Sequence, residues 1–223
     1  MLPVGIVKSR APANNTRMME ILCYTGGLAE TNAYLIKSQA GWLAVDAPEG
    51  FLDFMQQRGV TPTQLVLTHG HWDHIWDAAE IAKTYSCPVF YHQADETLCT
   101  RPEQMRSFGL PIKLNPVQAT RFLAQGDTFE HGQWSFQVLH IPGHCPGSIC
   151  LYEKTRAVAF VGDVLFAGSV GRTDLPGGSS EQLFSGIQSK LFALPDDVTA
   201  YPGHGPDTNL GVEKKTNPYV KLK

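Results

Sequence analysis

The sequence lacks three features that would place the protein in other classes. Its five cysteines include no C-x-x-C pair, so neither a disulfide framework nor a cysteine zinc knuckle is expected. Its 18 Lys and Arg residues are outnumbered by 21 Asp and Glu, and a net charge of −3 offers no electrostatic footprint for nucleic acid. No apolar run approaches the length of about 20 residues that spans a bilayer. We therefore expect a cytoplasmic protein with a small-molecule partner and no nucleic-acid or membrane partner.

The composition that is present is that of a globular chain. Among its 223 residues, 43% are hydrophobic and 17% are charged, and the length suits one large domain. Residues 1–17 are polar, contain proline, and lack the apolar centre of a secretory signal. We expect a loose N-terminal arm over residues 1–17 and a single domain over residues 18–223.

Hydrophobic patterning predicts two strand-rich halves, each accompanied by helices. The first half has expected strands over residues 21–24, 33–36, 42–45, 64–68 and 88–91, with helices over 51–58 and 75–85. The second has expected strands over residues 136–141, 149–152, 158–161 and 198–201, and an amphipathic helix over 179–194. The stretch 101–116 contains three prolines and is expected to be irregular. This order predicts an α/β (α+β) fold in which two sheets pack together with helices outside.

The segment Thr-His-Gly-His-Trp-Asp-His at residues 68–74 concentrates the chemistry of the chain. It follows an apolar run directly and carries the candidate ligands His69, His71, Asp73 and His74. Neutral imidazole and carboxylate are the ligands that a zinc-like metal prefers. A polar, histidine-rich turn is the alternative, but four potential ligands at a strand end are hard to explain by packing.

Three more candidate ligands follow predicted strands, and each has a glycine immediately before it. They are His144, Asp163 and His204. A glycine lets the backbone turn tightly and brings the next side chain close to a shared centre. Each residue alone would be more typical of a turn, but together with residues 68–74 they predict one metal site.

The other three histidines are expected to be structural. His140 alternates with the apolar face of its strand, which favours an outer hydrogen bond near the site or a satisfied core position. His92 ends a strand, where a structural role is again favoured. His131 lies between Glu130 and Gly132, which is typical of a solvated turn.

With these motifs the chain resembles the metallo-β-lactamase superfamily over about residues 19–210. The resemblance implies a four-layer αββα sandwich with metals at one edge of the two sheets. Within the superfamily, the chain is similar to the short bacterial members of the glyoxalase II group, the hydroxyacylglutathione hydrolases. That closer similarity rests on the Thr-Asn-Ala-Tyr-Leu-Ile segment at 31–36, the Pro-Gly-His-x-Pro-Gly-Ser segment around His144, the loop 168–177 and the Pro-Gly-His-Gly segment at 202–205.

The resemblance implies a dinuclear centre of two divalent metal ions, with zinc favoured and iron or manganese as alternatives. One ion would be held by His69, His71 and His144, the other by Asp73, His74 and His204, with Asp163 as the bridge. Asp73 and Asp163 are the predicted catalytic residues, Asp73 as a candidate proton shuttle. Such a centre lowers the pKa of bound water towards about 7, and the bridging hydroxide would attack a carbonyl carbon.

The leaving group and the loop after Asp163 bear on the substrate. A thiol has a pKa near 8.5 and departs as thiolate without a strong general acid, whereas an amine needs a proton donor. The resemblance then implies S-lactoylglutathione or a related hydroxyacylglutathione as the small acyl-thioester. Arg172 is the candidate for binding a substrate carboxylate, and an ion pair with Asp174 that shapes the loop is the alternative. Thr173 and Asp174 stand where the resembled hydrolases carry an aromatic pair.

The Gly-Arg-Thr-Asp segment at 171–174 also resembles persulfide dioxygenases, which share the fold. These oxidoreductases use a single iron held by two histidines and an aspartate, which would be His69, His144 and Asp163 here. The number and identity of the metals separate this alternative from the hydrolase. A secreted β-lactamase is disfavoured because residues 1–17 do not look like a secretory signal.

Overall fold

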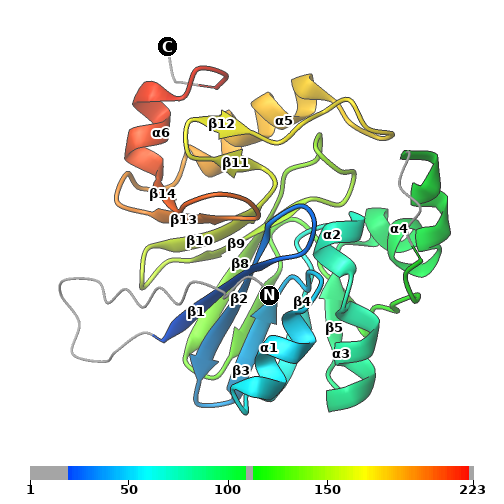
Figure 1. Cartoon of the computed structure of the whole chain (residues 1–223). Helices are drawn as coiled ribbons and strands as arrows, with labels where there is room; N and C mark the ends of the chain where they lie inside the picture. Colours follow the sequence, from blue (N-terminus) through cyan, green and yellow to red (C-terminus); the bar gives the residue numbers. More distant parts are fainter. Residues whose placement is uncertain (1–19, 109–112, 221–223) are drawn as a thin grey trace.

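The first half of the chain builds a six-stranded mixed sheet (Figure 1). The computed structural model of the protein describes residues 20–108 and 113–220. Neighbours from β1 to β3 are antiparallel and those from β3 to β6 are parallel. The strands are, in spatial order, β1 (Ile21–Gly26), β2 (Thr31–Ser38), β3 (Gly41–Val45), β4 (Pro62–Val66), β5 (Val89–Tyr91) and β6 (Arg121–Phe122).

The second half builds another six-stranded sheet. The pairs between β7 and β10 are antiparallel, β10 and β13 are parallel, and β14 closes the far edge. Its strands are, in spatial order, β14 (Thr208–Asn209), β13 (Thr199–Pro202), β10 (Val158–Gly162), β9 (Ile149–Glu153), β8 (Trp134–His140) and β7 (Thr128–His131). A small hairpin, β11 (Leu165–Phe166) and β12 (Ser169–Val170), follows β10.

Both faces of each sheet are apolar, because alternate residues of a strand point to opposite sides. On β2, Tyr34 and Ile36 pack between the two sheets, while Ala33 and Leu35 face the helices of the first half. The same alternation on β10 sends Phe160 between the sheets and Val161 to the other side. Each sheet therefore needs a partner on both faces, which fixes a sandwich with outer helices.

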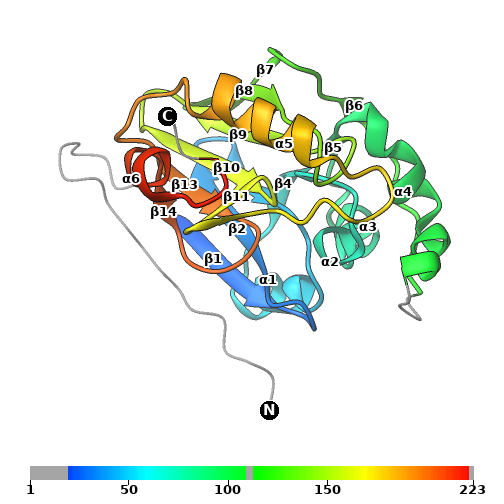
Figure 2. The same cartoon turned by 90° about the horizontal axis from the view of Figure 1, so that it is seen from above.

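The helices cover the two outer faces, so that the layers run helix, sheet, sheet, helix (Figures 1 and 2). The first sheet is covered by α1 (Phe51–Gln57) and α3 (Ala78–Tyr85), and the second by α5 (Ser180–Gly186) and α6 (Leu210–Thr216). Two short helices, α2 (Trp72–Ile75) and α4 (Glu96–Thr100), lie at one edge of the sandwich. The predicted four-layer αββα sandwich is confirmed.

Several local predictions need correction. The helix predicted over 75–85 begins later, as α3 at Ala78, and the separate short helix α2 precedes it. Asp77 lies between the two helices, and its carboxylate accepts the backbone N–H of Leu52 at 2.9 Å. The helix predicted over 179–194 begins as expected, because the Ser179 hydroxyl accepts from the backbone N–H of Gln182, but it widens into a π-helical turn over Ile187–Leu191. Part of the stretch expected to be irregular forms a 3₁₀ helix, Pro102–Phe108.

His131 is the clearest correction, since it was predicted to be solvated and is buried. Its side chain lies at the end of the sandwich opposite the carboxyl end of β4. There its Nδ1 is 2.9 Å from the Ser38 hydroxyl and its Nε2 is 2.9 Å from the Thr63 hydroxyl. The ring therefore joins β7 of the second sheet to two segments of the first. A sequence neighbourhood of Glu130 and Gly132 gives no sign of this contact between sheets.

Two further predictions concern the ends of the chain and membranes. The N-terminal arm predicted over residues 1–17 lies outside the described residues, and the single domain over 18–223 stays a prediction. Within residues 20–108 and 113–220, no helix has the length and apolar character to cross a bilayer.

Candidate metal centre

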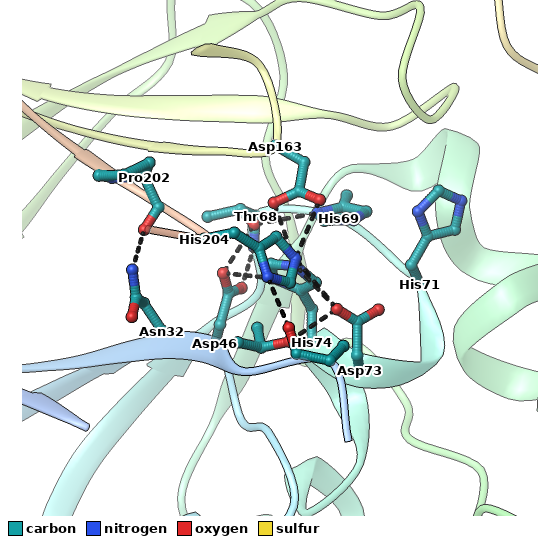
Figure 3. Close-up of polar contacts among 12 residues, drawn as sticks. Asn32, Asp46, Thr68, His69, His71, Asp73, His74, Asp163, Pro202 and His204 are labelled. Atoms are coloured by element: carbon teal, nitrogen blue, oxygen red, sulfur yellow. Dashed lines mark hydrogen bonds and ion pairs between the residues drawn. The ribbon is translucent and has the colours of Figure 1, made fainter. Parts of the chain in front are cut away.

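The candidate ligands lie together because they follow strands that end at the same edge of the sandwich. The segment 69–74 follows β4, Asp163 follows β10, and His204 follows β13, all at the carboxyl ends of strands in parallel pairs. His144 arrives from the loop between β8 and β9. Figure 3 shows most of these side chains converging from both sheets, with Asp163 and Asp73 on opposite sides of the imidazoles of His74 and His204.

Three imidazoles form one group of ligands. The Nε2 atoms of His69 and His144 are 3.2 Å apart, and Nδ1 of His71 lies 2.8 Å from Nε2 of His144. All three side chains are buried. Their nitrogens could hold one metal ion.

Two imidazoles and a carboxylate form the second group. Oδ2 of Asp73 lies 3.4 Å from Nε2 of His74 and 3.3 Å from Nε2 of His204. His204 is the most open of these side chains, with 28% of its surface exposed. These atoms could hold a second ion beside the first.

Asp163 lies between the two groups. Its Oδ1 is 3.3 Å from Nε2 of His74, while its Oδ2 is 3.3 Å from Nε2 of His204 and 3.4 Å from Nε2 of His144. The carboxylate thus faces imidazoles of both groups. This is the position that a bridging ligand requires.

The spacing of these atoms fits a metal better than a hydrogen-bonded cluster. A tetrahedral zinc with ligands at 2.0–2.1 Å has ligand-to-ligand edges of about 3.3–3.4 Å, and most of the distances above lie within 0.1 Å of that range. Among the described residues, no hydrogen-bond partner reaches buried Nε2 of His74 or Oδ1 of Asp163. Buried polar atoms without partners are costly, so their retention here needs a reason, and a bound cation provides one.

Outer hydrogen bonds hold three of the imidazoles in the orientation that points Nε2 inward. Nδ1 of His74 lies 2.8 Å from Asp46, Nδ1 of His144 lies 2.9 Å from the carbonyl of Arg172, and Nδ1 of His204 lies 3.1 Å from the carbonyl of Ala29. Such partners fix the tautomer of a metal-binding histidine.

Asp46 is a site residue that the sequence analysis missed. Its carboxylate is buried and accepts from the backbone N–H and the hydroxyl of Thr68 at 2.7 and 2.8 Å, as well as contacting His74. Asp46 directly follows β3, as Asp163 follows β10, so its position after a predicted strand was a usable signal, although it lacks the preceding glycine that marked Asp163.

The Thr-Asn pair at the start of β2 makes hydrogen bonds to two of the segments that carry candidate ligands. The Thr31 hydroxyl donates to Oδ2 of Asp73 at 2.7 Å, and the Asn32 amide donates to the carbonyls of Pro202 and Gly205 at 3.1 and 2.9 Å. One short segment of the first sheet therefore orients a candidate ligand and also holds the loop that carries His204.

The protein's own charges set the protonation of the two groups. Burial, followed by the neighbouring imidazoles, holds the pKa of His69 well below its usual value and lowers the pKa of His71 to about 3. Burial opposes ionisation of Asp73, but His74 and His204 lower its pKa to about 2. These are the forms in which imidazole and carboxylate bind metals.

Two imidazoles of the second group behave differently. Burial lowers the pKa of His74, but Asp73, Asp163 and Asp46 together raise it well above its usual value. Burial likewise opposes a raised pKa at His204, yet the carboxylates bring it to about 9. Both rings must therefore release a proton before they can bind a cation.

Arg172 lies beside the centre on the loop that follows β12. Its guanidinium makes two hydrogen bonds to Asp174, at 2.7 and 2.8 Å, so the predicted alternative of a loop-shaping ion pair is present. The same loop lines a hollow of about 270 Å³ bounded by residues 169–173, Phe184 and Tyr219. A Cβ at Gly171 would collide with the backbone of Asp163, so this hollow borders the candidate centre.

The remaining histidines of this edge are structural, as predicted. His92 and His140 stack with ring centroids 3.8 Å apart, and Nε2 of His140 lies 2.8 Å from the carbonyl of Pro146. That bond supports the loop carrying His144. Neither ring belongs to a cluster of candidate metal ligands among the described residues.

Comparisons with known proteins identify the family of the chain. The family profile described as the metallo-beta-lactamase superfamily matches residues 26–204. Hydroxyacylglutathione hydrolase GloC of Haemophilus influenzae is 40% identical over 161 residues, which cover 71% of this chain and 76% of GloC.

Two solved structures share the fold over most of both chains. The B3 metallo-beta-lactamase BLEG-1 has a TM-score of 0.82 at 32% identity, covering 91% of this chain and 100% of the other. The protein TTHA1623, solved in a di-iron-bound form, has a TM-score of 0.79 at 38% identity, covering 89% of this chain and 100% of the other. With the profile match and the arrangement of the two sheets, these similarities show that the chain belongs to the metallo-beta-lactamase superfamily.

Proposed function

We propose that the protein is a dinuclear metal-dependent hydrolase that cleaves a small acyl-thioester, S-lactoylglutathione or a related hydroxyacylglutathione. The observation that carries the proposal is the position of Asp163. Its two oxygens face two neighbouring groups of ligands, one of three imidazoles and one of two imidazoles with Asp73.

Two divalent ions bound by these groups would supply a water of lowered pKa and a Lewis acid for a carbonyl oxygen. The chain's own residues orient the ligands and balance charge. Asp73 and Asp163 place two negative charges against two dications, and Asp46 adds a third behind His74. The hydroxyl of Thr31 donates to Oδ2 of Asp73 and holds that oxygen beside His74 and His204.

The supply of protons to the leaving group favours a thioester over an amide as the substrate. Carboxylates bind metals in their deprotonated form, so Asp73 as a ligand has no proton of its own to give to a leaving group. An amine leaving group requires a proton, whereas a thiolate departs without one because the thiol pKa is near 8.5. The GloC relationship supports the same substrate class, since that relative is a hydroxyacylglutathione hydrolase.

The hollow beside Asp163 is the proposed binding place for the thiol carrier. Phe184 and Tyr219 provide apolar contact, and Arg172 provides a cation for a carboxylate. A substrate carboxylate would have to compete with Asp174 for that guanidinium. Because the ion pair is exposed, its loss costs little, and exchange of Asp174 for a substrate carboxylate is feasible.

The experiment is a side-by-side assay of purified protein with S-lactoylglutathione, glutathione persulfide and a chromogenic β-lactam, with metals measured on the same sample. We expect thioester hydrolysis that a chelator abolishes and that added zinc or iron restores. Oxygen uptake with the persulfide and a single iron per chain would instead establish the dioxygenase alternative. β-Lactam cleavage without thioesterase activity would also overturn the proposal.

The dioxygenase alternative has one structural basis. His69, His144 and Asp163 form a compact set, with Nε2 to Nε2 at 3.2 Å and Nε2 of His144 to Oδ2 of Asp163 at 3.4 Å. Two histidines and a carboxylate suit a single non-haem iron. The hydrolase is favoured because Asp73, His74 and His204 complete a second group that a single iron would leave unused.

A further inference from the structure

A third buried carboxylate ties together the two loops that carry the three-imidazole group. Asp95 ends the 3₁₀ turn Gln93–Asp95, which follows β5 in the first sheet, and its side chain is fully buried. One oxygen accepts the backbone N–H of Gly70 at 2.8 Å, and the other accepts the backbone N–H of Gly147 at 2.6 Å. The thiol of Cys145 donates to the same carboxylate at 3.1–3.2 Å.

The partners of Asp95 are the immediate neighbours of the ligands. Gly70 separates His69 from His71, and Cys145 follows His144 directly. The loop 69–71 continues the first sheet, whereas the loop 144–148 connects β8 to β9 in the second. The spacing of the three imidazoles therefore depends on how the sheets are joined at this edge, and Asp95 joins them there.

The glycines on both loops are fitted to this carboxylate. A Cβ at Gly147 would collide with the carboxylate of Asp95, and one at Gly70 would lie 2.9 Å from Cβ of Leu98 and 3.1 Å from Cβ of Asp95. Backbone N–H groups that converge on a buried carboxylate make strong, charge-assisted hydrogen bonds. Without the carboxylate, two buried N–H groups would lack acceptors and the loops would separate or shift.

We propose that Asp95 is a positioning residue for the three-imidazole group, setting the distance between His144 and the pair His69 and His71. The inference rests on the metal centre of the proposed function. It assigns Asp95 no contact with substrate or metal. Loss of the carboxylate lowers the affinity for the ion held by the three imidazoles. The affinity for the ion held by Asp73, His74 and His204 stays nearly unchanged.

The test compares metal affinities of the full chain with Asp95→Asn and Glu153→Gln. The control is matched, because Glu153 is also a buried carboxylate that accepts a backbone N–H, that of Arg156 at 2.7 Å, but it ends β9 away from the ligands. Zinc affinities are measured by competition with a chromophoric chelator, and melting temperatures are measured with zinc and with chelator. Outer partners of metal ligands typically contribute about 10–100-fold to affinity, so we expect one of the two zinc affinities of Asp95→Asn to fall by that factor.

Melting temperatures with and without zinc distinguish a residue that positions the metal ligands from one that only stabilises the fold. A structural residue lowers the melting temperature equally with and without zinc, as expected for Glu153→Gln. Asp95→Asn should also shrink the rise in melting temperature that zinc produces. If Asp95→Asn does not fold, Gly147→Ala perturbs the same contact from the other loop and should produce the same selective loss.

The outcomes distinguish the two proposals. A wild-type chain that binds no metal refutes the proposed function, and this inference with it. A wild-type chain that binds two ions, with both affinities unchanged in Asp95→Asn and Gly147→Ala, refutes the inference alone. An equal loss at both sites also overturns it.

Discussion

The two ends of the sandwich use buried histidine in opposite ways. At one end, both nitrogens of His131 meet hydroxyl groups, those of Ser38 and Thr63, at 2.9 Å. At the other end, buried Nε2 of His74 has no hydrogen-bond partner among the described residues and lies 3.3–3.4 Å from two carboxylates. A satisfied histidine stabilises the fold by itself, whereas the second arrangement gains further stability when a cation binds.

Stability at the two ends should therefore respond differently to metal. Replacing a residue at the His131 end should change the free energy of unfolding by the same amount with and without zinc. Replacing a residue at the ligand end should act mainly on the part of the stability that zinc supplies. Variants at the two ends, measured with and without zinc, test this division.

Asp163→Ala should have the largest effect, because Asp163 faces both groups of ligands. Zinc at 1,000 times its Kd stabilises a protein by about 4 kcal/mol per site, or roughly 8–16 °C in melting temperature for a chain of this size. We expect the variant to lose that rise together with its thioesterase activity. Calorimetry with zinc and with chelator measures the rise, and a variant that keeps it would show that Asp163 does not hold metal.

Asp46→Asn should have an intermediate effect. The substitution disturbs the bond from His74 Nδ1 and the acceptors for Thr68, but it removes no ligand from the centre. Zinc affinity should therefore fall by about 10–100-fold, which chelator competition measures. A His131 variant is the control and should retain the wild-type affinity. Equal affinities for wild type and Asp46→Asn would contradict the role assigned to Asp46.

His131→Ala should destabilise the fold without touching the centre. The change leaves the Ser38 and Thr63 hydroxyls without their imidazole partner and should lower the free energy of unfolding by about 1–3 kcal/mol. Urea unfolding in zinc and in chelator should give the same loss. A loss seen only in the presence of zinc would break the distinction between the two ends.

The contribution of His131 to the pH dependence of the free energy of unfolding should be the smallest effect. Burial lowers the pKa of His131, so below about pH 6.5 the unfolded chain takes up a proton that the folded chain refuses. Stability is then lost as the pH falls from 7.5 towards about 5, by at most about 1.4 kcal/mol per pH unit. With chelator present, His131→Gln should show a shallower loss than wild type over this interval, and identical slopes would show that His131 does not contribute.

The fold and the candidate ligands could be predicted from sequence for a physical reason. Strands with two apolar faces are visible as local patterns, and so is a dense set of ligand types in residues 69–74. His144, Asp163 and His204 each follow a predicted strand and a glycine, which makes them visible as well. β10 and β13 are parallel, so the residues after them meet at one edge, and the loop between β8 and β9 brings His144 to the same edge. Each of these features can be recognised from a short stretch of adjacent residues.

The features that could not be predicted depend on contacts between distant segments. His131 has polar sequence neighbours, yet its partners lie 68 and 93 residues away. Asp95 carries no local motif, and its role depends on Gly147, 52 residues later. The π-helical turn after α5 interrupts a helix whose apolar spacing is regular in the sequence. Side-chain partners of this kind become visible only when the two sheets are placed together.

The most direct test of the account is a count of metal ions by anomalous X-ray diffraction from crystals of the zinc- or iron-loaded protein. We expect two peaks at the sheet edge, one among His69, His71 and His144 and one among Asp73, His74 and His204, with Asp163 touching both. A single peak at His69, His144 and Asp163, in protein saturated with metal, would contradict the dinuclear centre and with it the proposed hydrolase.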